Sequence, residues 1–384
     1  MDFDFSEEQR MLRDTTRKLM DRHAPPQMVA EHDAADRYPY DLHRAWGEAG
    51  LFALPFREEV GGLGGSVIDL AIVAEEIAYT SADFFMAFAG AVFCGLNIER
   101  FGSEEQKADW LPRVFSGDLR MAISISEADA GSDITAMKTR AVRDGNQWVI
   151  HGDKLWCTGA GVKDTLLNVY LITDKTVDPR KGMSLFAIPN DAPGVELRKL
   201  DMLGRRCTGT YEIHFDNVRV EETALVGGLN KGWDCVLGGL QIERATSAAG
   251  NVGASLAVVD LASEYAKQRT QFGRPIGSNQ AIAHMLADMK TKVEAARALM
   301  WRAAWKVAEG QDALMDITMA KLFTSETYVE VANMGMQIFG AFGYSKEFPM
   351  QRHFRDSRSA TIAAGSSQMQ RNLIAGLMGH KIKG

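Results

Sequence analysis

Residues 286–309 read LADMKTKVEAARALMWRAAWKVAE, and this stretch decides the class of fold. It consists mainly of Ala, Leu, Met, Lys, Glu and Arg, the residues that favour helices most strongly. No proline occurs between Pro275 and Pro349. So long a run without helix breakers predicts long helices packed side by side in a bundle, and we expect a C-terminal helical-bundle domain over residues 229–384.

Upstream of the expected bundle the hydrophobic pattern changes its period. Residues 166–173 (LLNVYLIT), 183–188 (MSLFAI) and 211–220 (YEIHFDNVRV) are short runs rich in β-branched and aromatic residues, separated by turn residues. A further run, residues 148–150, follows an Asp-Gly turn. This pattern is typical of antiparallel strands, so we expect a middle antiparallel β domain over residues 119–228.

The first 118 residues show the hydrophobic spacing of helices. Ser6 and Gln9 form a capping-box pair before a run with helical hydrophobic spacing. Residues 67–79 (VIDLAIVAEEIAY) predict a second helix, with Glu75 and Glu76 on its polar side. The chain is therefore expected to be an α+β protein whose N-terminal α-helical domain covers residues 1–118.

Composition excludes several classes of function. The net charge of −7 repels phosphate backbones, so we expect no nucleic-acid partner. The four cysteines are scattered without a C-x-x-C motif, so we expect no metal site and no disulfide framework. The N-terminal residues lack a signal-peptide pattern, and no run of about 18 apolar residues is evident. We therefore expect a cytoplasmic protein without membrane insertion.

Five dispersed segments carry candidate ligand-binding residues: 125–133 (ISEADAGSD), 156–159 (WCTG), 269–273 (RTQFG), 337–344 (QIFGAFGY) and 365–368 (GSSQ). Each has an ordinary structural explanation as a surface turn, a core tryptophan or a helix end. Each also suits a ligand, because glycine lets backbone N–H groups approach an anion, and an aromatic plane beside a hydroxyl can hold a flat ring. Local chemistry alone leaves both explanations open.

The order and spacing of these segments resemble the acyl-CoA dehydrogenase family, from about residue 5 to the C-terminus. The resemblance also covers the turn at Gly61-Gly62 and the segments LWCTGAG and AAGSSQMQR. Ala128-Asp129 stands where the family usually has Pro-Gly or Pro-Asn, and Ala341 stands where it often has Gly. The resemblance implies the three-domain fold predicted above, with a C-terminal four-helix bundle, and FAD bound without a Rossmann motif.

The resemblance also implies roles for individual residues. Ser132 and Arg244 would contact the CoA moiety, and the backbone N–H of Ala364 would hold the thioester carbonyl. Cofactor sites shared between chains imply a homo-oligomer, usually a tetramer, in which a neighbouring subunit supplies Arg269, Phe272, Gln337 and Gly340. The full set of expected FAD contacts is Ser126, Trp156, Thr158, Arg269, Phe272, Gln280, Gln337, Gly340, Ser366 and Gln368.

The position of the catalytic base is the least usual feature. Most members of the family carry a Glu directly before the turn at Gly365, where this chain has Ala364. A smaller group, including isovaleryl-CoA and long-chain acyl-CoA dehydrogenases, carries a Glu before an Arg on a bundle helix. Glu243-Arg244 matches that position, so Glu243 is the predicted base. From the residues alone, an exposed Glu-Arg pair on a helix surface is the preferred explanation.

The implied activity is dehydrogenation of an acyl-CoA thioester to the trans-2-enoyl-CoA, with electrons passed to an electron-transferring flavoprotein. Residues 83–88 (DFFMAF) fall where the family lines its acyl pocket, and their aromatic rings favour a short or branched acyl chain. Packing of these phenylalanines in the core is an equally good explanation. The alternatives are an enoyl-CoA reductase of the crotonobetainyl-CoA reductase type and an oxygen-using flavin relative. The net charge disfavours a flavin-bearing DNA-binding protein.

Overall fold

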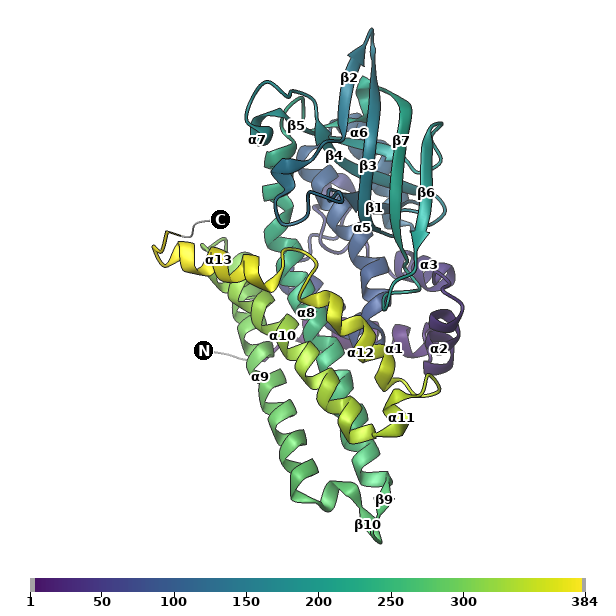
Figure 1. The fold of residues 1–384 in the computed structure, drawn as a ribbon, viewed down its shortest axis with the longest axis vertical. Coiled ribbons are helices and arrows are strands. Elements are labelled where there is room, and N and C mark those ends of the chain that lie inside the picture. Colours follow the sequence, from purple (N-terminus) through teal and green to yellow (C-terminus); the bar gives the residue numbers. More distant parts are fainter. Residues whose placement is uncertain (1–3, 382–384) are drawn as a thin grey trace.

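The computed structural model describes residues 4–381 and consists of three successive parts (Figure 1). Helices form the first part, a twisted sheet the second, and long helices the third. The predicted order of helices, strands and helices is therefore confirmed. The helices of the first part are α1 (Glu7–His23), α2 (Pro26–Ala34), α3 (Tyr40–Glu48), α4 (Val67–Thr80), α5 (Ala82–Phe101) and α6 (Glu104–Phe115).

The first helix begins and ends as its sequence predicts. The Ser6 side chain accepts a hydrogen bond from the Gln9 backbone N–H, and the Gln9 side chain accepts one from the Ser6 N–H, which completes the capping box. The helix ends at His23, before the prolines, and Pro26 opens α2 at a position where its missing N–H costs nothing.

Helix α5 corrects the expectation that no apolar run could span a membrane. Its 20 residues have a mean hydropathy of 1.3 over an 18-residue window, because Ala and Gly separate the aromatic residues. However, 78% of that window is buried inside the protein. The helix packs against α4, α8 and β1, so its apolar character is that of a core helix.

The second part is an eight-stranded sheet of order β6-β7-β3-β2-β4-β5-β8, with β1 paired to β4. Most neighbours are antiparallel as predicted, but β1 runs parallel to β4 from Arg120↔Thr165 to Ser124↔Val169. The parallel pair forms because the whole β2–β3 hairpin lies between these two strands in sequence and supplies the crossover. The strands are β1 (Arg120–Ser124), β2 (Arg140–Asp144), β3 (Gln147–Thr158), β4 (Thr165–Ile172), β5 (Met183–Pro189), β6 (Val195–Leu200), β7 (Thr210–Glu221) and β8 (Leu225–Val226).

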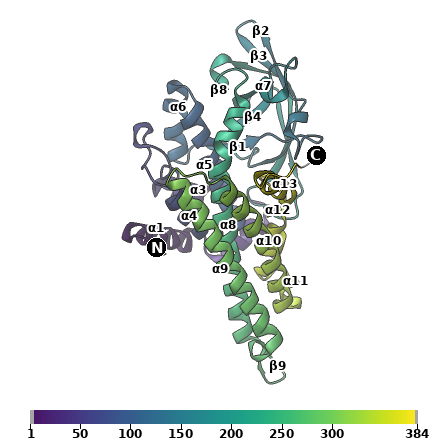
Figure 2. The same cartoon turned by 90° about the vertical axis from the view of Figure 1, so that its left-hand side faces the viewer.

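The third part is built on three long helices that pack side by side: α8 (Gly232–Gln268), α9 (Gln280–Ala308) and α10 (Leu314–Phe339). Shorter helices α11 (Ala341–Tyr344), α12 (Met350–Ala360) and α13 (Ser367–Leu377) follow, and α12 and α13 pack on α10. A small hairpin, β9 (Thr270–Gln271) with β10 (Arg274–Pro275), joins α8 to α9 at the end of the bundle remote from the sheet (Figure 2).

Helix α4 shows that one prediction was wrong. Glu75 and Glu76 do not form a polar side; both are buried. Arg297 on α9 donates to Glu75 at 2.9 Å, and Arg17 on α1 donates to Glu76 at 2.8 Å. Guanidinium groups from neighbouring helices thus neutralise two carboxylates that hydrophobic periodicity alone assigns to solvent.

Helix α8 of the bundle and helix α4 of the first part lie very close together. A Cβ atom added at Gly253 on α8 would lie only 2.0 Å from the carbonyl oxygen of Glu75 on α4. Any side chain at position 253 would therefore separate the N-terminal helices from the bundle. This contact fixes α8, which carries the candidate catalytic residues, against α4.

Substituting Arg297→Met tests the buried ion pair. The change would leave the Glu75 carboxylate buried and unpaired, so we expect the free energy of unfolding at pH 7 to fall by about 3 kcal/mol. Lys290→Met is the matched control on the same helix, because Lys290 pairs with Glu294 at the surface. That change should cost less than about 1 kcal/mol. Equal losses in urea unfolding for the two variants would contradict the assignment.

Candidate active site

The candidate residues of this site lie on three elements. Helix α8 carries Glu243 and Arg244, the loop between α12 and α13 carries Ala364, and the end of β3 carries Trp156 and Thr158. Helix α8 begins beside the sheet, where it packs on β5, and continues through the bundle (Figure 1).

Glu243 is not part of an exposed ion pair. It is partly buried and makes no hydrogen bond or ion pair among residues 4–381. Burial raises the pKa of its carboxyl group, and the charges of Arg244 and Lys321 only partly offset that effect. Burial and then the charge of Glu243 raise the pKa of the Cys94 thiol, so the carboxylate lies near α5. A carboxylate whose pKa is raised in this way is a stronger base than an exposed glutamate.

Arg244 is also drawn into the interior. Burial lowers its pKa, with Glu243 as the opposing charge, and its Nε atom has no partner in the described part of the chain. A Cβ added at Gly365 would lie 3.8 Å from an Arg244 guanidinium nitrogen. Helix α8 and the loop after α12 therefore meet at this arginine.

The loop of residues 361–366 presents free backbone donors. Ala364 and Gly365 both have left-handed backbone conformations, with φ of 55° and 82°. The loop is closed by a hydrogen bond from the Ser367 N–H to the Thr361 carbonyl. Within the described residues, the N–H groups of Ala364, Gly365 and Ser366 have no acceptor. Successive N–H groups in such a turn form a concave site for an anion or a developing oxyanion.

Lys321 on α10 was missed by the sequence analysis. Its side chain is 1% exposed, and its ammonium donates to the carbonyl oxygens of Gly365 at 2.7 Å and Ala360 at 3.1 Å. The signal was present, because Lys321 stands at core spacing with the buried residues Ile317 and Tyr328. A lysine in a core position needs partners that sequence alone does not reveal.

The end of β3 forms a rigid aromatic surface. Trp156 is 55% exposed with a φ of 65°, so the expectation of a core tryptophan is wrong. Behind it, the buried Lys154 ammonium donates to Glu127 and to the Ile125 carbonyl, each at 2.8 Å. The Ser126 carbonyl in turn accepts from the Leu155 N–H. An exposed indole held on this buried ion pair fits the flat ring system of a flavin.

Ser366 and Gln368 line a cavity of about 320 Å³ between α10, α12 and α13. Ser366 also caps α13 by accepting from the Met369 N–H, so the helix N-terminus faces this cavity. Backbone donors and the positive end of a helix dipole there suit an anionic cofactor. Ser132 lies exposed in the loop between β1 and β2.

The remaining expected FAD contacts lie far from these. Phe272 is 99% exposed at the tip of the β9–β10 hairpin, next to Arg269 at the end of α8. Gln280 begins α9, and Gln337 and Gly340 lie at the end of α10. The stretch 243–268 of α8 spans roughly 38 Å at 1.5 Å per residue. One chain therefore does not bring the two groups together.

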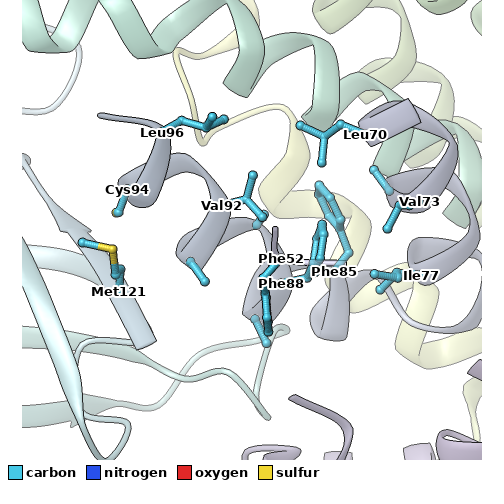
Figure 3. Close-up of a cluster of buried hydrophobic side chains, with 14 of the residues drawn as sticks. Phe52, Leu70, Val73, Ile77, Phe85, Phe88, Val92, Cys94, Leu96 and Met121 are labelled. Atoms are coloured by element: carbon cyan, nitrogen blue, oxygen red, sulfur yellow. The ribbon is translucent and has the colours of Figure 1, made fainter. Parts of the chain in front are cut away.

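Residues 83–88 belong largely to the core. Phe84 and Phe88 are fully buried, and Phe88 stacks on Phe52 at 5.3 Å between ring centroids. Figure 3 shows Phe85 and Phe88 inside the same hydrophobic cluster. The Asp83 carboxylate accepts hydrogen bonds from the Cys207 N–H at 2.7 Å and from Thr208, which anchors the β6–β7 loop. Core packing thus explains Phe84 and Phe88, while Phe85 also faces Gly250 of α8.

The raised pKa of Glu243 predicts a stability cost that depends on pH. The folded state binds this proton more tightly than the unfolded chain, so stability is lost as the pH rises above the ordinary value of 4.5 towards the folded pKa. Glu243→Gln mimics the protonated acid. We therefore expect the variant to melt at a higher temperature than the wild type at pH 7.5, with the difference vanishing near pH 4.

Glu264→Gln is the control for that comparison, since Glu264 is exposed on the same helix. It should leave the melting temperature unchanged at both pH values. A Glu243→Gln variant that is less stable than the wild type at pH 7.5 would show that the carboxylate has a stabilising partner.

The chain is similar to known proteins over nearly its whole length. Family models of the acyl-CoA dehydrogenase N-terminal, middle and C-terminal domains match residues 6–118, 122–218 and 230–378. A glutaryl-CoA dehydrogenase from Desulfococcus multivorans is 36% identical over 98% of this chain and 97% of that protein. A mitochondrial isovaleryl-CoA dehydrogenase from Pongo abelii is 34% identical, covering 96% of this chain and 88% of that one.

Solved structures of known proteins also share the fold of this chain. The structure of butyryl-CoA dehydrogenase from Megasphaera elsdenii superposes with a TM-score of 0.93 at 30% identity, covering 99% of this chain and all of that one. The chain therefore belongs to the FAD-dependent acyl-CoA dehydrogenase family.

Proposed function

We propose that the protein is a cytoplasmic dehydrogenase of short or branched acyl-CoA thioesters, with Glu243 as its catalytic base. The observation that carries the proposal is the pairing of an unpartnered, partly buried carboxylate with a loop of free backbone donors. Arg244 links the two, because it follows Glu243 on α8 and lies beside Gly365 of the loop.

The residues supply acid–base chemistry and charge stabilisation. Glu243 takes the α proton of the acyl chain, and the N–H of Ala364 donates to the thioester oxygen, where negative charge develops as that proton leaves. Bound FAD supplies the acceptor for the β hydrogen and its two electrons. The acyl chain thereby loses two hydrogens and becomes the trans-2-enoyl thioester. Arg244 and Ser132 are assigned to the CoA moiety.

The FAD site requires two copies of the chain. Ser126, Trp156 and Thr158 are assigned to the flavin ring, and the cavity lined by Ser366 and Gln368 to another part of the cofactor. The hairpin that carries Phe272 lies at the far end of the bundle. A fully exposed phenylalanine there is explained if it covers the adenine end of FAD in a neighbouring subunit. We infer a homo-oligomer, a tetramer by analogy with the family, which passes electrons to an electron-transferring flavoprotein.

The proposed substrate size rests on residues around Glu243. Phe85 fills space beside Gly250 of α8, and Ala363 and Ala364 contribute only small side chains from the loop after α12. Relatives that act on glutaryl-CoA and isovaleryl-CoA, by their names, also support a short or branched chain. A reductase working on an enoyl-CoA would use the same residues in the opposite direction.

An anaerobic panel of acyl-CoA thioesters tests the reaction and the chain length together. The purified protein should be yellow, and short or branched thioesters should bleach the flavin faster than chains of twelve or more carbons. With an artificial electron acceptor in air, turnover should form little hydrogen peroxide. Rapid stoichiometric peroxide would identify an oxygen-using enzyme, and reoxidation by enoyl-CoA without reduction by acyl-CoA would identify a reductase.

Glu243→Gln tests the assignment of the base. We expect FAD content and acyl-CoA binding to persist while flavin reduction slows by roughly 10²-fold or more, because the α proton has no acceptor. Adding Ala364→Glu to this variant should restore part of the rate, since the new carboxylate faces the same carbon. Glu264→Gln should reduce flavin at the wild-type rate. A Glu243→Gln enzyme as fast as the wild type would place the base elsewhere.

A further inference from the structure

The 361–366 loop has support beyond its own closing hydrogen bond from Ser367 to Thr361. It contains two consecutive left-handed residues, and an alanine in that conformation costs about 1 kcal/mol or more. Two side chains from other helices bind its carbonyls. Lys321 on α10 donates to Gly365 at 2.7 Å, and Gln370 on α13 donates to Gly365 at 3.0 Å.

These contacts decide where the free donors point. Lys321 also binds the Ala360 carbonyl at the last residue of α12, so a single ammonium ties both ends of the loop to α10. With the carbonyls turned inward, the N–H groups of Ala364, Gly365 and Ser366 are left without acceptors in the described residues. Lys321 is fully buried and has no carboxylate within ion-pair distance among residues 4–381, so holding carbonyls is its direct contact.

The ammonium also contributes charge to the site. Burial, together with the charges of Arg244 on α8 and Arg205 in the β6–β7 loop, lowers the pKa of Lys321 to about 8. Glu243 on α8 and Glu326 on α10 act in the opposite direction. Lys321 is therefore charged at pH 7 and loses its proton as the pH rises through about 8.

We propose that Lys321 is a positioning residue for the dehydrogenation, which holds the 361–366 loop so that the N–H of Ala364 meets the thioester oxygen. The inference rests on the proposed function. Lys321 on α10 thereby shapes a donor site that consists of backbone N–H groups alone. Because the donors act mainly on the charged transition state, the loss of Lys321 affects kcat more than KM.

Steady-state kinetics from pH 6 to 10 test this with Lys321→Met, Lys321→Gln and the exposed control Lys290→Met. The substrate is the thioester that bleaches the flavin fastest in the panel. At pH 7 we expect kcat of Lys321→Met to fall about 10²-fold, with KM changed less than about threefold, because misplacement by about 1 Å has that effect. Lys321→Gln, which still donates to a carbonyl, should recover part of this loss.

The pH profile separates a positioning role from a general loss of stability. Wild-type kcat should decline above pH 8, because neutral Lys321 donates weaker hydrogen bonds than the ammonium, and Lys321→Gln, which has no proton to lose, should lack this decline. If kcat of Lys321→Met equals that of the wild type, this inference is wrong while the proposed function stands. The same follows if kcat of Lys321→Gln still declines above pH 8. That second comparison remains decisive if the Met variant does not fold. If none of the acyl-CoA thioesters reduces the flavin of the wild type, the proposed function is wrong, and this inference fails with it.

Discussion

The close packing of α8 against the N-terminal helices is the constraint on which the rest of the structure depends. At Gly253 the backbone of α4 leaves no room for a side chain, and at Gly250 the ring of Phe85 on α5 occupies that space. Helix α8 thereby becomes a fixed axis that touches the sheet, the N-terminal helices and the bundle. Glu243 lies two to three turns before these contacts, so its position relative to the N-terminal helices follows from backbone packing rather than from hydrogen bonds.

Buried charges in this protein fall into two kinds. Glu75 with Arg297, and Glu127 with Lys154, are paired at hydrogen-bond distance and join elements that are distant in sequence. Removing one partner of such a pair is strongly destabilising. Glu243 has no such partner, although it is shielded from solvent enough for its pKa to rise. A group that the fold neither neutralises nor exposes is costly to keep, which is the expected mark of a catalytic carboxylate.

The sequence predicts the parts of this fold that depend on local pattern. All of the run 286–309 except its last residue lies inside α9, and the four apolar runs became β3, β4, β5 and β7. The hydrophobic pattern did not reveal β2 and β6, because both strands are largely exposed and about half of their residues are charged. Glu75 was misassigned because its partner lies 222 residues away. Lys321 was missed for the same reason, since its partners are backbone carbonyls that only the tertiary fold brings near.

The 361–366 loop contributes backbone N–H groups, and this explains how the proposed catalytic carboxylate can stand at position 243 instead of 364. Its free N–H groups depend on the left-handed conformation of Ala364 and Gly365 and on the carbonyl contacts of Lys321 and Gln370. None of these involves the side chain at position 364. An alanine there therefore keeps the donor geometry, while the proton acceptor that we propose, Glu243, stands on α8. Because backbone donors and side-chain base are separate parts of the site, one can change place without disturbing the other.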